Sequence, residues 1–125
     1  MYNYVLQSSR LDDVPPAPIG NLQARKTGST VRIQWTTPRD AVRFHVVWSD
    51  RTISEAQSTV GTVRNWWAAN TVGTALVGVS GSVQTLEFDV GSAGTVHVAM
   101  FCFDASDNMS RMSSSVLASA GVLST

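Results

Sequence analysis

Two histidines, His45 and His97, are the residues of this sequence best suited to bind a metal. Imidazole is a common zinc ligand, and zinc sites in proteins have a closed tetrahedral ligand set. Both histidines fall in alternating segments, which predicts that they point outward from two strands and could lie side by side. No cysteine shares that face and no carboxylate lies between them. We therefore expect two surface histidines beside apolar groups, and no bound metal.

Oxygen-bearing side chains are concentrated in residues 104–108, Asp-Ala-Ser-Asp-Asn, a composition that calcium loops share. A calcium ion takes about six to eight oxygen ligands, and no bidentate glutamate follows at the spacing of a known loop. Asp and Asn in turns usually accept hydrogen bonds from nearby backbone. The sequence therefore predicts a structural turn.

The single cysteine, Cys102, excludes a disulfide within the chain. Its position in an alternating segment places it on the inward side, which predicts a buried and unreactive thiol. The chain has no glycine-rich phosphate loop, no paired carboxylates and no convergent nucleophile and base. We therefore expect a protein that is not an enzyme and that needs no cofactor.

Residues 96–104 have two different faces because their side chains alternate. Val96, Val98, Met100 and Cys102 form an apolar inward set. The opposite face carries large aromatic groups where a half-solvated strand usually carries polar ones, so something must cover it. The cover could be a like subunit, another protein or the chain's own segments. The sequence predicts a docking patch made of His45, Val47, His97, Phe101 and Phe103.

Two adjacent tryptophans, Trp66 and Trp67, complete the candidate binding residues. Neighbouring residues on a strand face opposite sides, so at most one of the two readily reaches a core. The other then needs a partner, which could be a subunit, a sugar ring or the N-terminal arm. That arm carries Tyr2 and Tyr4, which we include in the candidate interface.

The elements that must position these residues are short strands, because apolar residues recur with a period of two and turn residues separate them. We expect one domain over residues 15–118, an N-terminal arm over 1–14 that ends before paired prolines, and a C-terminal tail over 119–125. The predicted strands are residues 21–24, 30–36, 43–49, 58–64, 74–79, 83–90, 95–104 and 112–117.

The composition of the chain limits the classes of partner that it is expected to bind. Only 14% of the residues are charged, against about 25% in an average soluble domain. Part of the surface is therefore expected to be buried in an assembly, or solubility rests on Ser, Thr and Asn. The net charge is zero and the basic residues are scattered, which argues against a nucleic-acid partner. No apolar run approaches the roughly 20 residues of a membrane span, and the N-terminus has no signal-peptide pattern.

Several of these segments, taken in order, resemble the fibronectin type III family. Residues 15–24 resemble its proline-rich entry and first strand, residues 31–38 its second strand with Trp35, residues 44–48 its third, and residues 96–110 its sixth strand and following turn. The resemblance implies an all-β, immunoglobulin-like, two-sheet antiparallel sandwich. Val96 departs from the family, which usually has a tyrosine there. The residues expected to be buried between the sheets are Trp35, Val46, Trp48, Val98 and Met100.

The function expected from these features is a non-enzymatic structural module that docks on other protein subunits. Small domains of this kind resemble accessory proteins of bacteriophage virions, such as capsid decoration, head-to-tail connection and tail or fibre components. Such a protein is made in the host cytoplasm and resides in the virion. The alternative is a carbohydrate-binding or spacer module of a secreted bacterial protein, extracellular or at the cell surface, with Trp66 and Trp67 as a sugar-stacking platform.

Overall fold

The computed structural model describes residues 14–72 and 77–118. This part of the chain is all-β: it contains strands and a single 3-10 turn but no α-helix. No helix in it is long and apolar enough to cross a membrane. In chain order the elements are β1 Gln23–Thr27, β2 Thr30–Thr36, β3 Arg43–Ser49, β4 Thr52–Ser54, β5 Val63–Asn65, the 3-10 turn η1 Trp66–Ala68, β6 Asn70–Val72, β7 Val83–Asp89, β8 His97–Phe103 and β9 Val116–Leu117.

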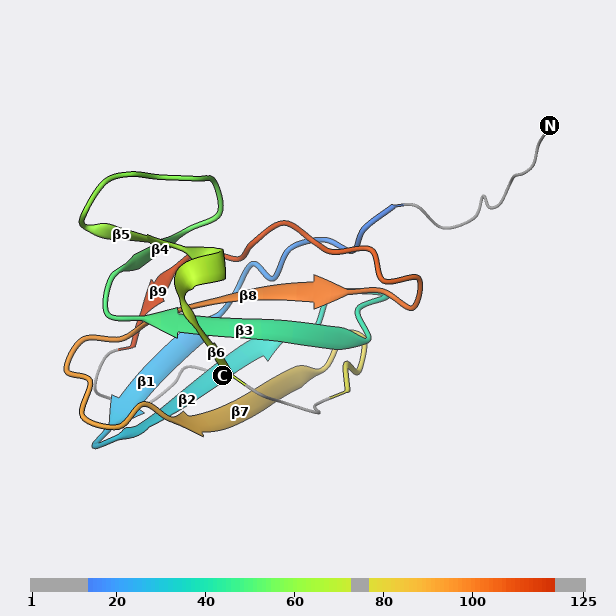
Figure 1. The fold of residues 1–125 in the computed structure, drawn as a ribbon. Helices are drawn as coiled ribbons and strands as arrows, with labels where there is room; N and C mark the ends of the chain where they lie inside the picture. Colours follow the sequence, from blue (N-terminus) through green and yellow to red (C-terminus); the bar gives the residue numbers. More distant parts are fainter. Residues whose placement is uncertain (1–13, 73–76, 119–125) are drawn as a thin grey trace.

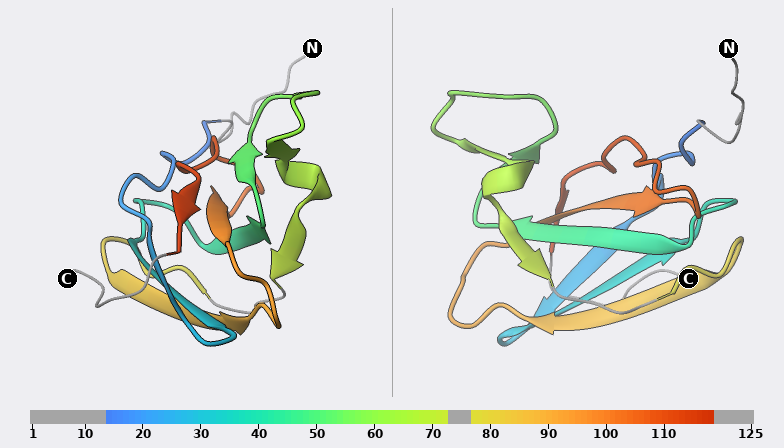
Figure 2. Two further views of the ribbon diagram at one scale, coloured as in Figure 1. Left: turned by 90° about the vertical axis from the view of Figure 1, so that its left-hand side faces the viewer. Right: turned by 45° about the vertical axis from the view of Figure 1, so that its right-hand side comes forward.

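Two antiparallel sheets are stacked as in a β-sandwich (Figures 1 and 2). The first is three-stranded, in the order β1-β2-β7, and the second is four-stranded, in the order β6-β3-β8-β9. A third, two-stranded sheet, β4-β5, lies on the far side of β3 and β8 from the first sheet. The expected all-β class is confirmed.

The main core lies between the two large sheets. Trp35 is 1% exposed, and its ring meets Phe44 edge-to-face at 5.1 Å between centroids. The inward set of β8 is buried, including Cys102, whose thiol pKa is raised by burial. Trp48 differs from the prediction because it is only half-buried; it lies near the end of β3 and packs against this core.

The strand predictions were correct for the four longest strands, β2, β3, β7 and β8, to within two residues at each end. The predicted strand 21–24 is shifted to β1, Gln23–Thr27. Residues 58–62 and 77–79 are loop instead of strand, and β4 and β6 were missed. The predicted segment 74–76 and the arm with Tyr2 and Tyr4 lie outside the described residues, as does 119–125.

The segment after β8 shows why the predicted strand 112–117 is shortened to β9. Ser110 and Ser113 place their hydroxyls where a neighbouring strand would place carbonyls. The amide of Met100 donates to Ser113 Oγ at 2.8 Å, and that of Cys102 donates to Ser110 Oγ at 2.9 Å. Because side chains satisfy these donors, the last sheet edge needs little regular strand.

The acidic turn after β8 is structural, as expected. Asp104 is buried, and its Oδ1 accepts hydrogen bonds from the amides of Ser106 and Asn108, both at 2.9 Å. Its Oδ2 accepts from the Asn108 side chain at 2.9 Å. The carboxylate thus closes the turn through local backbone.

Candidate functional site

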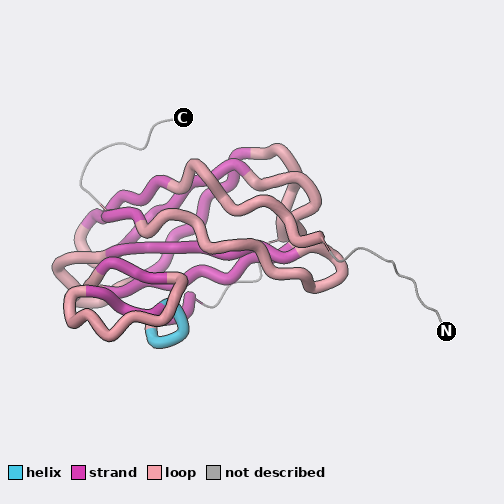
Figure 3. The backbone as a smooth tube through the Cα atoms, turned by 90° about the horizontal axis from the view of Figure 1, so that it is seen from above, coloured by secondary structure: helices cyan, strands magenta, loops and turns pink. Residues whose placement is uncertain are grey.

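The outer face of β3 and β8 carries the apolar side chains that the sequence predicted there. His45 lies opposite Phe101 in the antiparallel pairing, and Val47 lies opposite Ala99. Phe101 is nevertheless only 2% exposed and Val47 is fully buried. Residues 50–69, which we call the covering segment, fold back over this face (Figures 1 and 3).

The covering segment has its own small core. It leaves the end of β3, forms the parallel pair β4-β5, and ends in η1, the helical turn drawn in cyan in Figure 3. Ile53 of β4 is buried against Val47 and Ala99, with Trp66 and Met112 packed around them. Burial of these apolar groups stabilises the packing of the covering segment on the sheet.

Hydrogen bonds fix the covering segment to the chain that follows β8. The Ile53 amide donates to Ser115 Oγ at 2.9 Å. Glu55 accepts from the Arg111 guanidinium at 2.7 and 3.1 Å and from the Met112 amide at 3.1 Å. The hydrogen bond from Arg111 is the main reason that the pKa of Glu55 is lowered. Both apolar packing and hydrogen bonds therefore hold the covering segment against the rest of the domain.

The two adjacent tryptophans have different environments. They lie on a 3-10 turn, so the predicted alternation across a strand does not apply to them. Trp66 turns inward, with its ring 4.8 Å from that of Phe101 and 5.8 Å from that of His45. Trp67 is 54% exposed and meets Trp66 at 5.8 Å with an interplanar angle of 82°. Partial burial in this cluster lowers the pKa of His45.

The remaining residues of the predicted patch are separated from one another. His97 is half-buried opposite Ser49, four positions along β3 from His45, so the histidines are not side by side. Phe103 is half-buried beneath the Arg43 guanidinium, which lies 4.9 Å from the ring centroid. The residues predicted as one docking patch therefore do not form one exposed surface. In the described ranges, no three His, Cys, Asp or Glu side chains gather as metal ligands would.

An open pocket of about 530 Å³ lies where β3 ends. Three parts of the chain enclose it: the end of β3, the covering segment with the start of β6, and the turn between β7 and β8. The lining residues are Trp48, Ser49, Asp50, Arg64, Ala68, Asn70, Val90, Ser92, Ala93 and Gly94.

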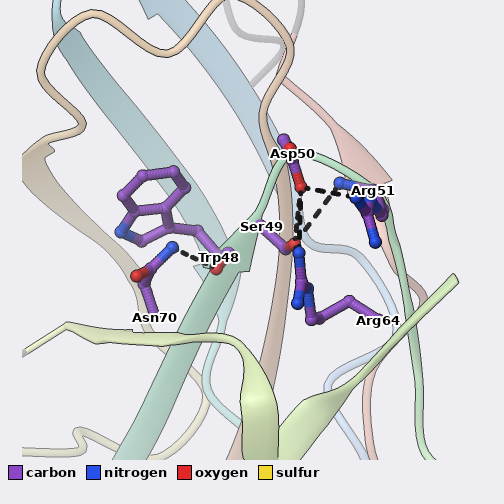
Figure 4. A network of polar contacts seen from close by, with 6 residues as sticks. All are labelled: Trp48, Ser49, Asp50, Arg51, Arg64 and Asn70. Atoms are coloured by element: carbon purple, nitrogen blue, oxygen red, sulfur yellow. Dashed lines mark hydrogen bonds and ion pairs between the residues drawn. The ribbon is translucent and has the colours of Figure 1, made fainter.

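A polar network occupies one side of this pocket (Figure 4). Asp50 Oδ1 lies 3.6 Å from an Arg64 Nη and 3.7 Å from Arg51 Nε. Arg64 Nε also donates to Ser49 Oγ at 3.3 Å. On the other side, the Asn70 amide donates to the Trp48 carbonyl at 3.3 Å. Asn70 thus lies beside the Trp48 indole, whereas the side chains of Ser49, Asp50 and Arg64 lie across the end of β3 from it (Figure 4).

Sequence reasoning missed this pocket. The local signal is the run of Ser49, the last residue of β3, with Asp50 and Arg51 after it, because polar residues at the end of a strand often form sites. Arg64 and Asn70 join it because the covering segment returns to the same end of β3, which no local pattern indicates.

No family model matches this chain, and no curated protein does either. Among solved structures, the crystal structure of the Clostridium perfringens spore cortex lytic enzyme SleM is similar, with a TM-score of 0.54 and 14% sequence identity. The alignment covers 83% of this chain and 28% of that one, so this chain spans less than a third of the length of SleM. At this identity the likeness concerns the fold alone.

Proposed function

We propose that the chain is a non-enzymatic, fibronectin type III-like module that docks on protein subunits of a larger assembly. The sheet orders β1-β2-β7 and β6-β3-β8-β9 support the fold assignment, because immunoglobulin-like sandwiches divide their strands between two sheets in this manner. Trp35 at the centre of the core matches the tryptophan of the family's second strand.

The exposed ring of Trp67 is the observation that carries the docking proposal. The covering segment removes Phe101 and Val47 from the surface, yet it presents a second tryptophan outward at 54% exposure. That ring is held by the edge contact with Trp66, which is itself packed on the sheet. Tryptophans are enriched among the residues that dominate protein–protein binding energies.

The assembly we propose is a bacteriophage virion, with the chain as a capsid decoration, head-to-tail connection or tail or fibre component. The low charge of the chain supports an assembled rather than a freely dissolved protein. The step from fold to virion rests on analogy with other small sandwich modules.

The test is co-production of the tagged chain with the structural proteins encoded by neighbouring genes, followed by sedimentation of the particles. We expect the parent chain in the particle fraction and Trp67→Ala in the free fraction. Val60→Ala, which truncates another exposed apolar residue of the covering segment, is the matched control and should stay with the particles. The proposal fails if the parent chain never joins a particle, or if Trp67→Ala joins as well as the control.

The second candidate is a carbohydrate-binding or spacer module of a secreted bacterial protein. Part of SleM, a spore cortex lytic enzyme, has a similar fold, which shows only that such a fold occurs within a bacterial enzyme. Trp66 and Trp67 do not form the sugar-stacking platform that the sequence predicted. The planes of the two rings are at 82° to each other, and Trp66 is turned toward Phe101. Two rings in that geometry cannot stack on one sugar chain together.

A further inference from the structure

We infer that the pocket at the end of β3 binds a neutral carbohydrate. Its volume of about 530 Å³ lies within the range of small-molecule sites, about 300 to 1,000 Å³. The site is distinct from the exposed ring of Trp67, so this inference does not depend on whether the chain docks in a virion. It gives the second candidate function a site other than the tryptophan pair.

The apolar part of the pocket is suited to the carbon face of a sugar ring. Trp48 is half-buried and packs against the main core, so its indole is held in place before any ligand arrives. Asn70 lies beside that indole and donates to the Trp48 carbonyl (Figure 4). A pyranose ring has a face of C–H groups that packs on the electron-rich face of an aromatic ring.

The polar part is suited to hydroxyl groups. Asp50, Arg64 and Asn70 supply a carboxylate, a guanidinium and an amide, which are planar groups able to make two hydrogen bonds each. Two adjacent hydroxyls of a sugar lie at a fixed spacing, so one planar group can form a hydrogen bond with each of them. Asp50 and Arg64 contact Ser49 and each other at 3.3 to 3.6 Å, and both side chains remain partly exposed, so a ligand can reach them.

The charge of the lining favours a neutral ligand. One carboxylate, Asp50, and one guanidinium, Arg64, line the pocket and contact each other; Arg51, the second cation beside Asp50, is not among the lining residues. A phosphate or nucleic-acid site needs an excess of positive charge, which this lining does not provide. An uncharged, polyhydroxylated ligand uses both groups without leaving either charge uncompensated.

The test uses defined tetrasaccharides of β-1,4-glucose and β-1,4-N-acetylglucosamine as neutral probes and a galacturonate tetramer as the anionic comparison. Titration calorimetry gives affinity, and the indole N–H signals in NMR spectra show which tryptophan responds. We expect at least one neutral probe to bind with a Kd on the order of 0.1 to 1 mM, with a shift of the Trp48 signal and little change at Trp67.

Two variants and one control variant locate the binding. Ser92→Trp places a bulky ring at the pocket from an exposed turn position and should abolish binding, whereas Ser80→Trp, in the exposed turn before β7, should leave it unchanged. Asn70→Ala should weaken binding about two- to tenfold, a loss typical of one removed hydrogen-bonding group. Unchanged unfolding midpoints confirm that the variants are folded.

Three results would overturn the inference: no saturable binding of either neutral probe, binding of the galacturonate alone, or equal binding by Ser92→Trp, Asn70→Ala and the parent. None of these variants changes Trp67. Failure here is therefore distinguishable from failure of the docking proposal.

Discussion

The outer faces of the two large sheets have opposite characters. On the β1-β2-β7 sheet, Arg32, Thr85 and Glu87 point outward and are exposed, and Arg32 lies 3.7 Å from Glu87. On the β6-β3-β8-β9 sheet the outward positions hold Val47 and Phe101, and the chain folds residues 50–69 over them. A sheet face is left open where its side chains are well solvated and is covered where they are not.

This difference shows that an apolar outer face need not be an interface between molecules. The alternation along β8 identified the face correctly, and one of the three covers considered, the chain's own segments, is the one observed. The stabilities of variants on the two faces test this difference.

Truncation of Phe101 should have the largest effect. Phe101→Ala removes a buried ring shared by β8 and the covering segment, so we expect a loss of about 3 to 5 kcal/mol of unfolding free energy. Thr85→Ala on the open face is the control and should change it by less than about 0.5 kcal/mol. Chemical denaturation of both variants checks this, and equal losses would remove the distinction between the faces.

The burial of Phe101 also changes what is expected of the docking patch predicted from the sequence. If Phe101 and Phe103 lay on an exposed patch, exchanging both for serine would leave the unfolding midpoint nearly unchanged. Because Phe101 is buried within the chain, that double variant should instead be strongly destabilised. The faces of the strand are not reversed, since Met100 and Cys102 are buried on the other side.

Truncation of Trp66 should come next. Trp66 is half-buried against Phe101 and His45, so Trp66→Ala should cost about 2 kcal/mol, less than a fully buried ring. Trp67→Ala should cost less than about 0.5 kcal/mol because its ring is mostly in solvent. Thermal unfolding of the pair tests the comparison, and the opposite ranking would contradict the orientation of η1.

Loss of the Ser115 hydroxyl should have a smaller effect. In Ser115→Ala the amide of the buried Ile53 loses its acceptor, which we expect to cost about 1 kcal/mol. The adjacent exposed residue provides the control, Ser114→Ala, with almost no expected change. Hydrogen exchange at the Ile53 amide should accelerate in the first variant alone. Equal exchange rates would mean that this bond does not hold the covering segment.

Acidification should weaken the covered face in two steps of modest size. Burial lowers the pKa of His45, so the unfolded chain takes up a proton first, and stability falls as the pH drops below about 6.5. The pKa of Glu55 is lowered mainly by Arg111, so its contribution is lost at lower pH, below about 4.5. Denaturation between pH 7 and pH 3 measures both steps. His45→Gln should remove the first step and Glu55→Gln the second; a step that persists has another cause.

Sequence patterns correctly predicted the parts of the molecule whose structure depends on residues close together in the chain. The alternation of β2, β3, β7 and β8, the buried Cys102 and the turn closed by Asp104 all follow from neighbouring residues. The covering segment does not, because its position depends on contacts such as Ile53 with Ser115, far apart in the sequence. The pocket was missed for the same reason, since Arg64 reaches Asp50 only after the segment has folded back.

The contact between Trp66 and Phe101 tests the central claim most directly, because it joins the covering segment to the sheet. Their ring centroids are 4.8 Å apart, close enough for strong nuclear Overhauser effects between ring protons. We predict intense cross-peaks between the two rings in the isolated chain at neutral pH, with none between Trp67 and Phe101. Absence of the Trp66 cross-peaks in a folded, monomeric sample would show that Phe101 is not covered by its own chain.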